Sequence, residues 1–277
     1  MSEGQKGRHG GVKQIESREN KTFKRLNGLK NRRNREKEGL FLAEGERFVS
    51  EIPKGEGVEY FVLSETFCET HDTAQYEAAA KTLLLPDVLF DMLCDTETPQ
   101  GVLAVCKKLE WQEDEVFRRD KPFLLLAENL QDPGNLGTVI RTADACGADA
   151  VFLSKGSVDL YNPKVLRATM GSLFHIPVFQ NVSLEETAGK LRKKGIPLYA
   201  AHLRGEDMPY ALNLQNACAF LIGNEGRGLS EKGAALCSQW VRIPMPGHAE
   251  SLNASVAAAV LLYETVRQRI SGNISKI

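Results

Sequence analysis

Polar side chains follow a long apolar run in the middle of the chain, at a point where chemistry is expected. The run FLLLAENL leads into NLGTVIR, in which Asn135 and Arg141 are six residues apart. A near-continuous apolar run is typical of a parallel strand covered on both faces, and ligands bind at the carboxyl ends of such strands. On a helix, this spacing would leave both side chains close enough to share a pocket. The plainer interpretation is a first helical turn with a surface arginine.

A second segment, LIGNEGRGLS, places three glycines and Glu225 directly after another apolar strand. Its pattern is neither Gly-x-Gly-x-x-Gly nor a P-loop, so it does not predict a cradle for nucleotide phosphates. Glycine at these positions, beginning with Gly223, would allow positive φ and a close approach of the backbone to a ligand. The plainer interpretation is a simple turn.

A third segment, IPMPGHAESLNASVAAAV, begins at Ile243 and joins a strand to a long helix. Ser251 and Asn253 precede that helix, and both are residue types that cap helix N-termini. Small residues such as Ala257 and Ala258 allow close packing. We expect the helix to pack on its own sheet and against a second subunit.

Composition indicates a globular chain with an uneven charge distribution. The 277 residues are 42% hydrophobic and 26% charged, which suits two domains with ordinary cores. Residues 1–40 hold twelve Lys and Arg against five Asp and Glu, a net charge of +7 in a chain whose total is −1, so the remainder carries −8. A basic arm on an acidic body predicts a polyanionic partner. A solvated terminus is the alternative.

The cysteines and apolar runs argue against metal, secretion and membrane insertion. None of the six cysteines belongs to a Cys-x-x-Cys pair or has a histidine at ligand spacing, so we expect reduced cysteines and no metal. The longest apolar stretch, Ala254 to Tyr263, has ten residues and is too short to span a bilayer. The N-terminus lacks the apolar run of a signal peptide. We therefore expect a cytoplasmic protein.

The chain divides into two α/β regions with a charged segment between them. We expect a disordered basic tail over 1–14, a small α/β domain over 15–110, a linker over 111–121 and a second domain over 122–272. In the small domain, EYFVL and QGVLAVCKK are predicted strands, and 74–93 is a predicted helix broken at Pro86. Alternating strands and helices in the second domain predict an open parallel sheet.

Each of the three segments is weak alone, but their order and intervals are specific. Asn-x-Gly-x-x-x-Arg, then Gly-Asn-Glu-Gly-x-Gly, then Ile-Pro-Met…Ser-Leu-Asn-x-Ser-x-Ala closely resembles the three motifs of the SpoU/TrmH family, in the SPOUT class of RNA methyltransferases. The resemblance covers residues 123–270. The N-terminal stretch SREN…NRRNREKEGLFLAEGERFV resembles the small L30e-like RNA-binding domain that many members carry.

The resemblance implies a fold, a cofactor and an assembly. The family fold is an α/β domain with a parallel sheet and a deep trefoil knot, a rare exception to the rule that chains are not threaded. S-adenosyl-L-methionine lies in the knot, held mainly by the backbone of three loops, and the family works as a homodimer through this domain. The matching cofactor-binding positions are Leu203, Gly223, Ile243, Met245 and Leu252.

The resemblance also implies methyl transfer to a ribose 2′-hydroxyl. The matching catalytic positions are Asn135, Arg141, Glu225, Ser251 and Asn253. A guanidinium with a pKa above about 12 is essentially never neutral. We therefore assign Arg141 to binding the target phosphate and to stabilising negative charge on the 2′-oxygen. Ser251 would orient the phosphate or ribose, and Asn135 and Glu225 would hold Arg141 and the loops.

The expected substrate is structured RNA, most reasonably 23S-type ribosomal RNA because of the L30e-like extension. The phosphate contacts expected in the basic arm are Arg32, Arg33, Arg35 and Lys37. A tRNA target is one alternative, and a non-catalytic RNA-binding or ribosome-assembly factor is another. A Rossmann-type dehydrogenase is disfavoured, because the chain lacks Gly-x-Gly-x-x-Gly and the strand AVFLS runs into Lys155 rather than an acidic residue.

Overall fold

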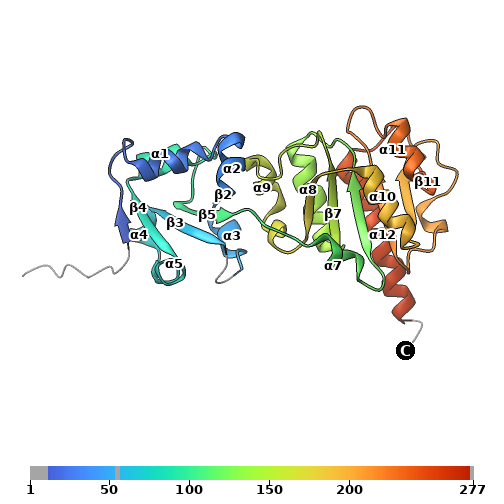
Figure 1. Ribbon diagram of the computed structural model, residues 1–277, viewed down its shortest axis with the longest axis horizontal. Helices are drawn as coiled ribbons and strands as arrows, with labels where there is room; N and C mark the ends of the chain where they lie inside the picture. The colour runs from blue at the N-terminus through green and yellow to red at the C-terminus, as the bar shows by residue number, and fades with distance from the viewer. Residues whose placement is uncertain (1–11, 54–56, 275–277) are drawn as a thin grey trace, which may run out of the picture. The chain divides into compact units, whose positions relative to one another are not determined.

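The computed structural model describes residues 12–53 and 57–274. The chain forms two compact units, Met1–Leu109 and Glu110–Ile277 (Figure 1). Each unit has its own sheet and its own hydrophobic core.

The N-terminal unit is built on a five-stranded mixed sheet of order β1-β4-β3-β5-β2. The pairs β1–β4 and β3–β4 are parallel, and β5 pairs antiparallel with β3 and β2. The strand bounds are β1 Val12–Gln14, β2 Leu40–Glu44, β3 Val58–Ser64, β4 Lys81–Leu85 and β5 Val102–Lys107.

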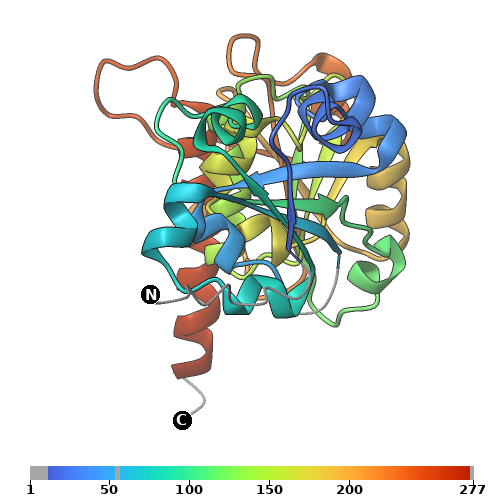
Figure 2. The same cartoon turned by 90° about the vertical axis from the view of Figure 1, so that its left-hand side faces the viewer.

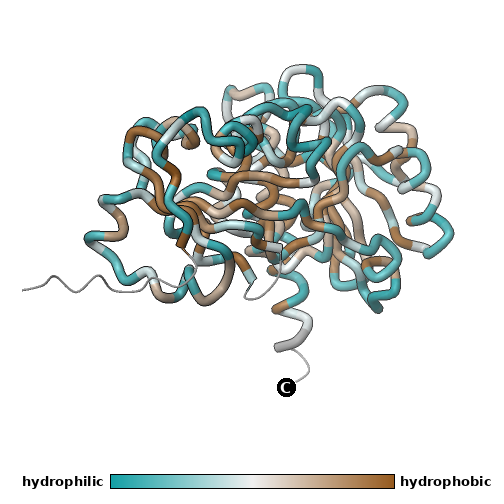
Figure 3. Tube along the Cα trace, turned by 60° about the vertical axis from the view of Figure 1, so that its left-hand side comes forward, coloured by the Kyte–Doolittle hydropathy of each residue, from teal (hydrophilic) through white to brown (hydrophobic). Residues whose placement is uncertain are grey.

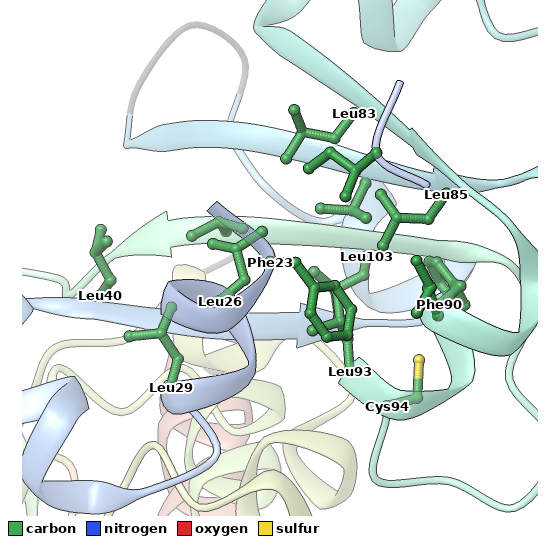
Figure 4. Close-up of a cluster of buried hydrophobic side chains, with 14 residues drawn as sticks. Phe23, Leu26, Leu29, Leu40, Leu83, Leu85, Phe90, Leu93, Cys94 and Leu103 are labelled. Carbon is green, nitrogen blue, oxygen red and sulfur yellow. The ribbon is translucent and has the colours of Figure 1, made fainter. Parts of the chain in front are cut away.

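Helices lie on both sides of this sheet (Figure 2). On one face α1 and α6 cover a cluster that includes Phe23, Leu26, Leu85 and Phe90, drawn in Figure 4. On the other face Phe61 contacts Tyr76 of α5, edge to face, with ring centroids 5.1 Å apart. The helix bounds are α1 Lys21–Gly28, α2 Arg32–Glu38, α3 Glu46–Ser50, α4 Glu65–Thr70, α5 Ala74–Ala79 and α6 Asp87–Leu93.

Two elements of this unit differ from the sequence prediction. The predicted helix over 74–93 is wrong, because β4 separates α5 from α6. Residues 12–14 of the predicted disordered tail form β1, whose backbone pairs with β4, while residues 1–11 lie outside the described residues. The strands β1 and β4 form by pairing with residues distant in the sequence, and the local sequence pattern does not predict such pairing.

The C-terminal unit has a six-stranded, fully parallel sheet of order β11-β9-β10-β6-β7-β8, as the sequence predicted. Strands β6, β7 and β10 are buried along their whole length, because helices cover both faces of the sheet. Figure 3 shows hydrophobic segments in brown along the strands. The bounds are β6 Phe123–Ala127, β7 Ala150–Ser154, β8 Val178–Val182, β9 Leu198–Ala201, β10 Cys218–Ile222 and β11 Gln239–Val241.

One face of this sheet is covered by α7, α10 and α11, and the other by α8, α9 and α12. A Cβ at Gly137 of α8 would lie 2.3 Å from the Ala168 Cβ, so glycine allows α8 and α9 to approach closely. The bounds are α7 Glu113–Phe117, α8 Pro133–Ala145, α9 Pro163–Thr169, α10 Leu184–Lys193, α11 Glu231–Leu236 and α12 Ala254–Ile274, with short 3₁₀ turns at Ser172–Phe174 and Pro209–Ala211.

The segment predicted as a linker, 111–121, contains α7. Val116 and Phe117 are buried in the core of the C-terminal unit, so this stretch is part of that unit's fold. The segment was predicted as a linker because most of its residues are charged, although Val116 and Phe117 are apolar.

All six cysteines are free thiols, four of them buried. Among residues 12–53 and 57–274, no helix is both long enough and apolar enough to cross a membrane.

Candidate active site

The strand order brings the carboxyl ends of β9, β10 and β11 together at one edge of the C-terminal sheet. The loops that follow these strands enclose a pocket of about 270 Å³. All five predicted cofactor-binding residues line it, together with Glu225 and Ser251: Leu203, Gly223, Ile243, Met245 and Leu252. Side chains from sequence positions some 50 residues apart therefore share one cavity.

The loop after β10 is a tight turn that requires glycine. A Cβ at Gly223 would lie 2.2 Å from the carbonyl carbon of Gly228 and 2.3 Å from the Leu229 nitrogen. Asn224 and Gly228 exchange two backbone hydrogen bonds of 2.9 and 3.0 Å, and Gly228 has φ +67°. This turn brings backbone groups to the pocket wall, as the glycine pattern predicted.

Glu128, at the carboxyl end of β6, anchors the far end of this loop. Its carboxylate accepts hydrogen bonds from the Ser230 backbone N–H (2.8 Å) and hydroxyl (2.6 Å). Glu128 was not among the predicted site residues, although a carboxylate directly after a buried strand is a usable signal.

Glu225 joins the first motif to the second. Its carboxylate accepts hydrogen bonds from the backbone N–H groups of Asp132 (2.9 Å) and Gln131 (3.2 Å) and from the Asn135 amide (3.2 Å). Burial acts to raise the pKa of Glu225, but these hydrogen bonds outweigh it and hold the pKa below its ordinary value. A carboxylate stabilised in this way is a weak base.

Asn253 joins the third motif to the first. Its amide donates to the Asn135 side-chain oxygen (2.8 Å), while its own oxygen accepts from the Ser255 backbone N–H (2.8 Å) and hydroxyl (2.7 Å). Asn253 therefore acts as the N-terminal cap of α12 and as a link between loops. Ser251 has no such capping bond among the described residues and lines the pocket instead.

Arg141 lies apart from this network. It is exposed on α8 and does not line the pocket, and its side chain has no hydrogen bond or ion pair with any described residue. Six residues along a helix rotate a side chain by about 240° and advance it by about 9 Å, so Asn135 and Arg141 face different directions. Asn135 and Glu225 bind each other, and neither has a hydrogen bond or ion pair with Arg141. The expectations that they hold Arg141, and that Asn135 and Arg141 share a pocket, are therefore wrong.

His202 is a pocket residue that the sequence analysis missed. Its ring lies 4.4 Å from the Trp240 ring, and its Nδ1 accepts the Arg204 backbone N–H (3.1 Å). Burial and the nearby Arg204 lower the pKa of His202, which favours a neutral ring with the proton on Nε2. Only its position beside Leu203 pointed to it in the sequence.

One predicted RNA-binding residue in the N-terminal unit is misassigned. Arg35 is 4% exposed, and its guanidinium donates to the carbonyl oxygens of Leu29 (2.9 Å) and Lys30 (2.8 Å) at the end of α1. It stabilises a helix terminus and is not available to a phosphate. Arg32, Arg33 and Lys37 are exposed on α2.

No group of three or more His, Cys, Asp or Glu side chains in the described parts of the chain could hold a metal ion.

Comparison with known proteins gives matches along almost the whole chain. Residues 122–263 match the SpoU rRNA Methylase family, and residues 20–104 match the MRM3-like substrate binding domain. The 23S rRNA (guanosine(2553)-2′-O)-methyltransferase RlmP of Bacillus subtilis is 37% identical over 252 residues, covering 91% of this chain and 98% of that protein. The 23S rRNA (uridine(2479)-2′-O)-methyltransferase of Streptomyces viridochromogenes is 35% identical, with 88% of each chain covered.

A solved structure agrees with these sequence matches. The crystal structure of an AdoMet-bound rRNA methyltransferase from Sinorhizobium meliloti matches with a TM-score of 0.83 and 28% identity, covering 93% of this chain and 98% of that one. The predicted resemblance is thus confirmed by family, sequence and fold. The chain belongs to the SpoU rRNA methylase family.

Proposed function

We propose that the protein transfers the methyl group of S-adenosyl-L-methionine to a ribose 2′-hydroxyl of 23S-type ribosomal RNA, in the cytoplasm. One observation carries this proposal: five residues predicted to bind the cofactor line one pocket at the carboxyl edge of the sheet. Two relatives with 23S rRNA 2′-O-methyltransferase names cover nearly the whole chain and add support.

The pocket residues suit a nucleoside cofactor. Leu203, Ile243 and Leu252 offer apolar walls, and the turn at Gly223 offers backbone donors and acceptors. When bound, S-adenosyl-L-methionine supplies an electrophilic methyl group on a sulfonium. The protein's own task is then to exclude water, orient the ribose hydroxyl and accommodate its proton.

Arg141 is assigned to the RNA. Its guanidinium has no partner among the described residues and is exposed, so it is available to a phosphate near the target ribose. A planar, permanently charged fork can hold the phosphate and stabilise negative charge on the 2′-oxygen. Asn135, Glu225 and Asn253 are positioning residues in this proposal, because their polar groups are used to join the loops.

A homodimer through α12 is part of the proposal. The exposed apolar side chains Val256, Val260, Tyr263 and Ile270 follow each other at spacings of four, three and seven residues, which puts them on one stripe of the helix. Their exposed fractions are 46%, 39%, 54% and 56%. A stripe of this kind is typical of a surface that a second helix covers.

We also propose the trefoil knot of the family. The edge strand β11 is followed by a loop and then by α12, which packs against α8 and β10 toward the middle of the sheet. A return of the chain end from the edge strand to the middle of the sheet is compatible with a knotted path.

The test is a methylation map. Total RNA from a strain lacking the gene should lose 2′-O-methylation at one or a few 23S positions, and the wild-type gene should restore it. Arg141→Ala should fail to restore it, and purified Arg141→Lys should lose about 10²–10³ in turnover while binding cofactor normally. An unchanged map, or an Arg141→Lys protein with most of its turnover, would contradict the proposal.

A further inference from the structure

The covered face of the N-terminal sheet changes from apolar to cationic at one end. Tyr60 of β3 is the direct neighbour of Lys81 on β4, and Lys13 of β1 is the direct neighbour of Leu83. Side chains alternate between faces along a strand, so Lys13, Lys81 and Tyr60 lie on the same face as Leu83. The hydrophobic core beneath α1 and α6 lies on that face and includes Leu83, which is labelled in Figure 4.

These side chains enclose a small pocket. Its volume is about 230 Å³, and its lining consists of Lys13, Thr22, Tyr60, Lys81, Thr82 and Leu83. Thr22 comes from the first turn of α1, whose positive end therefore borders the same space. The lining combines two ammonium groups with hydroxyl groups on a partly apolar floor.

The pocket has cations without counterions. Within residues 12–53 and 57–274, neither lysine has an ion-pair partner, and the hydroxyls of Thr22 and Tyr60 have no hydrogen-bond partner. Two acidic residues of the neighbouring segments are engaged elsewhere: Glu19 pairs with Lys24, and Glu59 pairs with Arg25. Two cations on diagonal positions of neighbouring strands repel each other, and a bound anion would relieve that repulsion.

We propose that this pocket binds a phosphate group of the RNA backbone. The inference rests on the proposed function, since the anion is part of the RNA substrate. Lys13 and Lys81 supply the charge, and Thr22 and Tyr60 supply short hydroxyl donors. A contact of this kind reads no base, so it fixes the register of the RNA on the N-terminal unit.

The test compares two double variants of the full-length protein that remove the same charge. Lys13→Ala/Lys81→Ala removes both ammonium groups from the pocket. Lys193→Ala/Lys194→Ala removes two exposed lysines from the end of α10 in the other unit. Binding of deproteinised 23S rRNA is measured between about 50 and 200 mM salt. Losing the contact with one phosphate should reduce the slope of log K against log salt by about 0.7–0.9. The α10 variant should keep the wild-type slope.

Three further measurements make the result decisive. Lys13→Arg/Lys81→Arg should keep the slope. In all variants the N-terminal unit should resist limited proteolysis as it does in the wild type, which shows that this unit is folded. Equal slopes for the pocket and α10 variants would overturn the inference while leaving methyl transfer intact. Weaker binding of inorganic phosphate with an unchanged RNA slope would also overturn it, because the site would then serve free phosphate. A wild-type protein that neither binds nor methylates rRNA would instead refute the proposed function.

Discussion

At the scale of single residues, the glycine turn after β10 makes the sharpest prediction about the pocket. Gly223→Ala puts a methyl group within 2.2 Å of the Gly228 backbone, so the turn must open and the pocket wall must move. We expect loss of S-adenosyl-L-methionine binding by about tenfold or more, measured by calorimetry.

Gly247→Ala, in the loop before α12, is the matched control, because a Cβ there meets no atom within 4 Å and Gly247 does not line the pocket. It should bind the cofactor nearly as the wild type does. Equal losses in both variants would mean that general loop damage, and not the close approach at Gly223, accounts for the effect.

Glu225 gives a prediction about pH at the same scale. Its folded-state pKa is lowered, so the ionised carboxylate stabilises the fold above the unfolded pKa of about 4.3, and this stability disappears as pH falls through the lower folded value. Glu225→Gln should be destabilised by about 1 kcal/mol at pH 7, because an amide NH₂ would face backbone donors.

Thermal melts of both proteins from pH 7 to pH 3 test this sign. The difference in melting temperature should shrink at the acid end, where the wild type has also lost its charge. A constant difference over the whole range would show that the ionised carboxylate is not the source of the stability.

At the scale of elements, α12 predicts how the protein assembles. Val260→Glu puts a charge in the middle of the exposed apolar stripe and should convert a dimer into a monomer in sedimentation experiments at micromolar concentration. Val88→Glu on α6 is the control, since Val88 is 73% exposed and lies in the other unit. A monomeric wild type, or a dimer that survives Val260→Glu, would contradict the homodimer.

The elements also show how far the sequence alone could lead. The parallel sheet was predictable because its strands are continuous apolar runs that local pattern reports directly. β4 was not, because its residues Lys81–Leu85 adjoin helix-compatible segments and become a strand only by pairing with β3 and β1. The pocket residues were found from motif order, whereas His202 and Arg35 needed the fold, since their roles depend on Trp240 and on the end of α1.

At the scale of the whole molecule, the basic arm is not a removable tail. Residues 12–40 include β1, α1 and α2, and Phe23, Leu26 and Leu29 of this stretch are buried in the N-terminal core. Burial of each such side chain contributes about 1.5–3 kcal/mol, against a typical domain stability of about 5–15 kcal/mol. Deleting residues 1–40 should therefore unfold the N-terminal unit.

Limited proteolysis tests this expectation. The N-terminal unit should become sensitive to protease after deletion of residues 1–40, while the C-terminal unit stays resistant and binds cofactor. Deletion of residues 1–11 removes no described residue and should leave both units resistant. A protected N-terminal unit in the longer deletion would refute the argument.

The hydrogen bonds that join the three motifs have a consequence for synthesis of the chain. Asn135 and Asn253 are 118 residues apart, and Gln131 and Glu225 are 94 apart. Closing loops of this length costs conformational entropy before any contact rewards it, so such contacts form late in folding. A ribosome-bound chain whose α12 has not emerged can already form β6, α8 and β7, yet it lacks one wall of the pocket. We therefore expect the cofactor to bind only after α12, the last helix of the domain, has been synthesised.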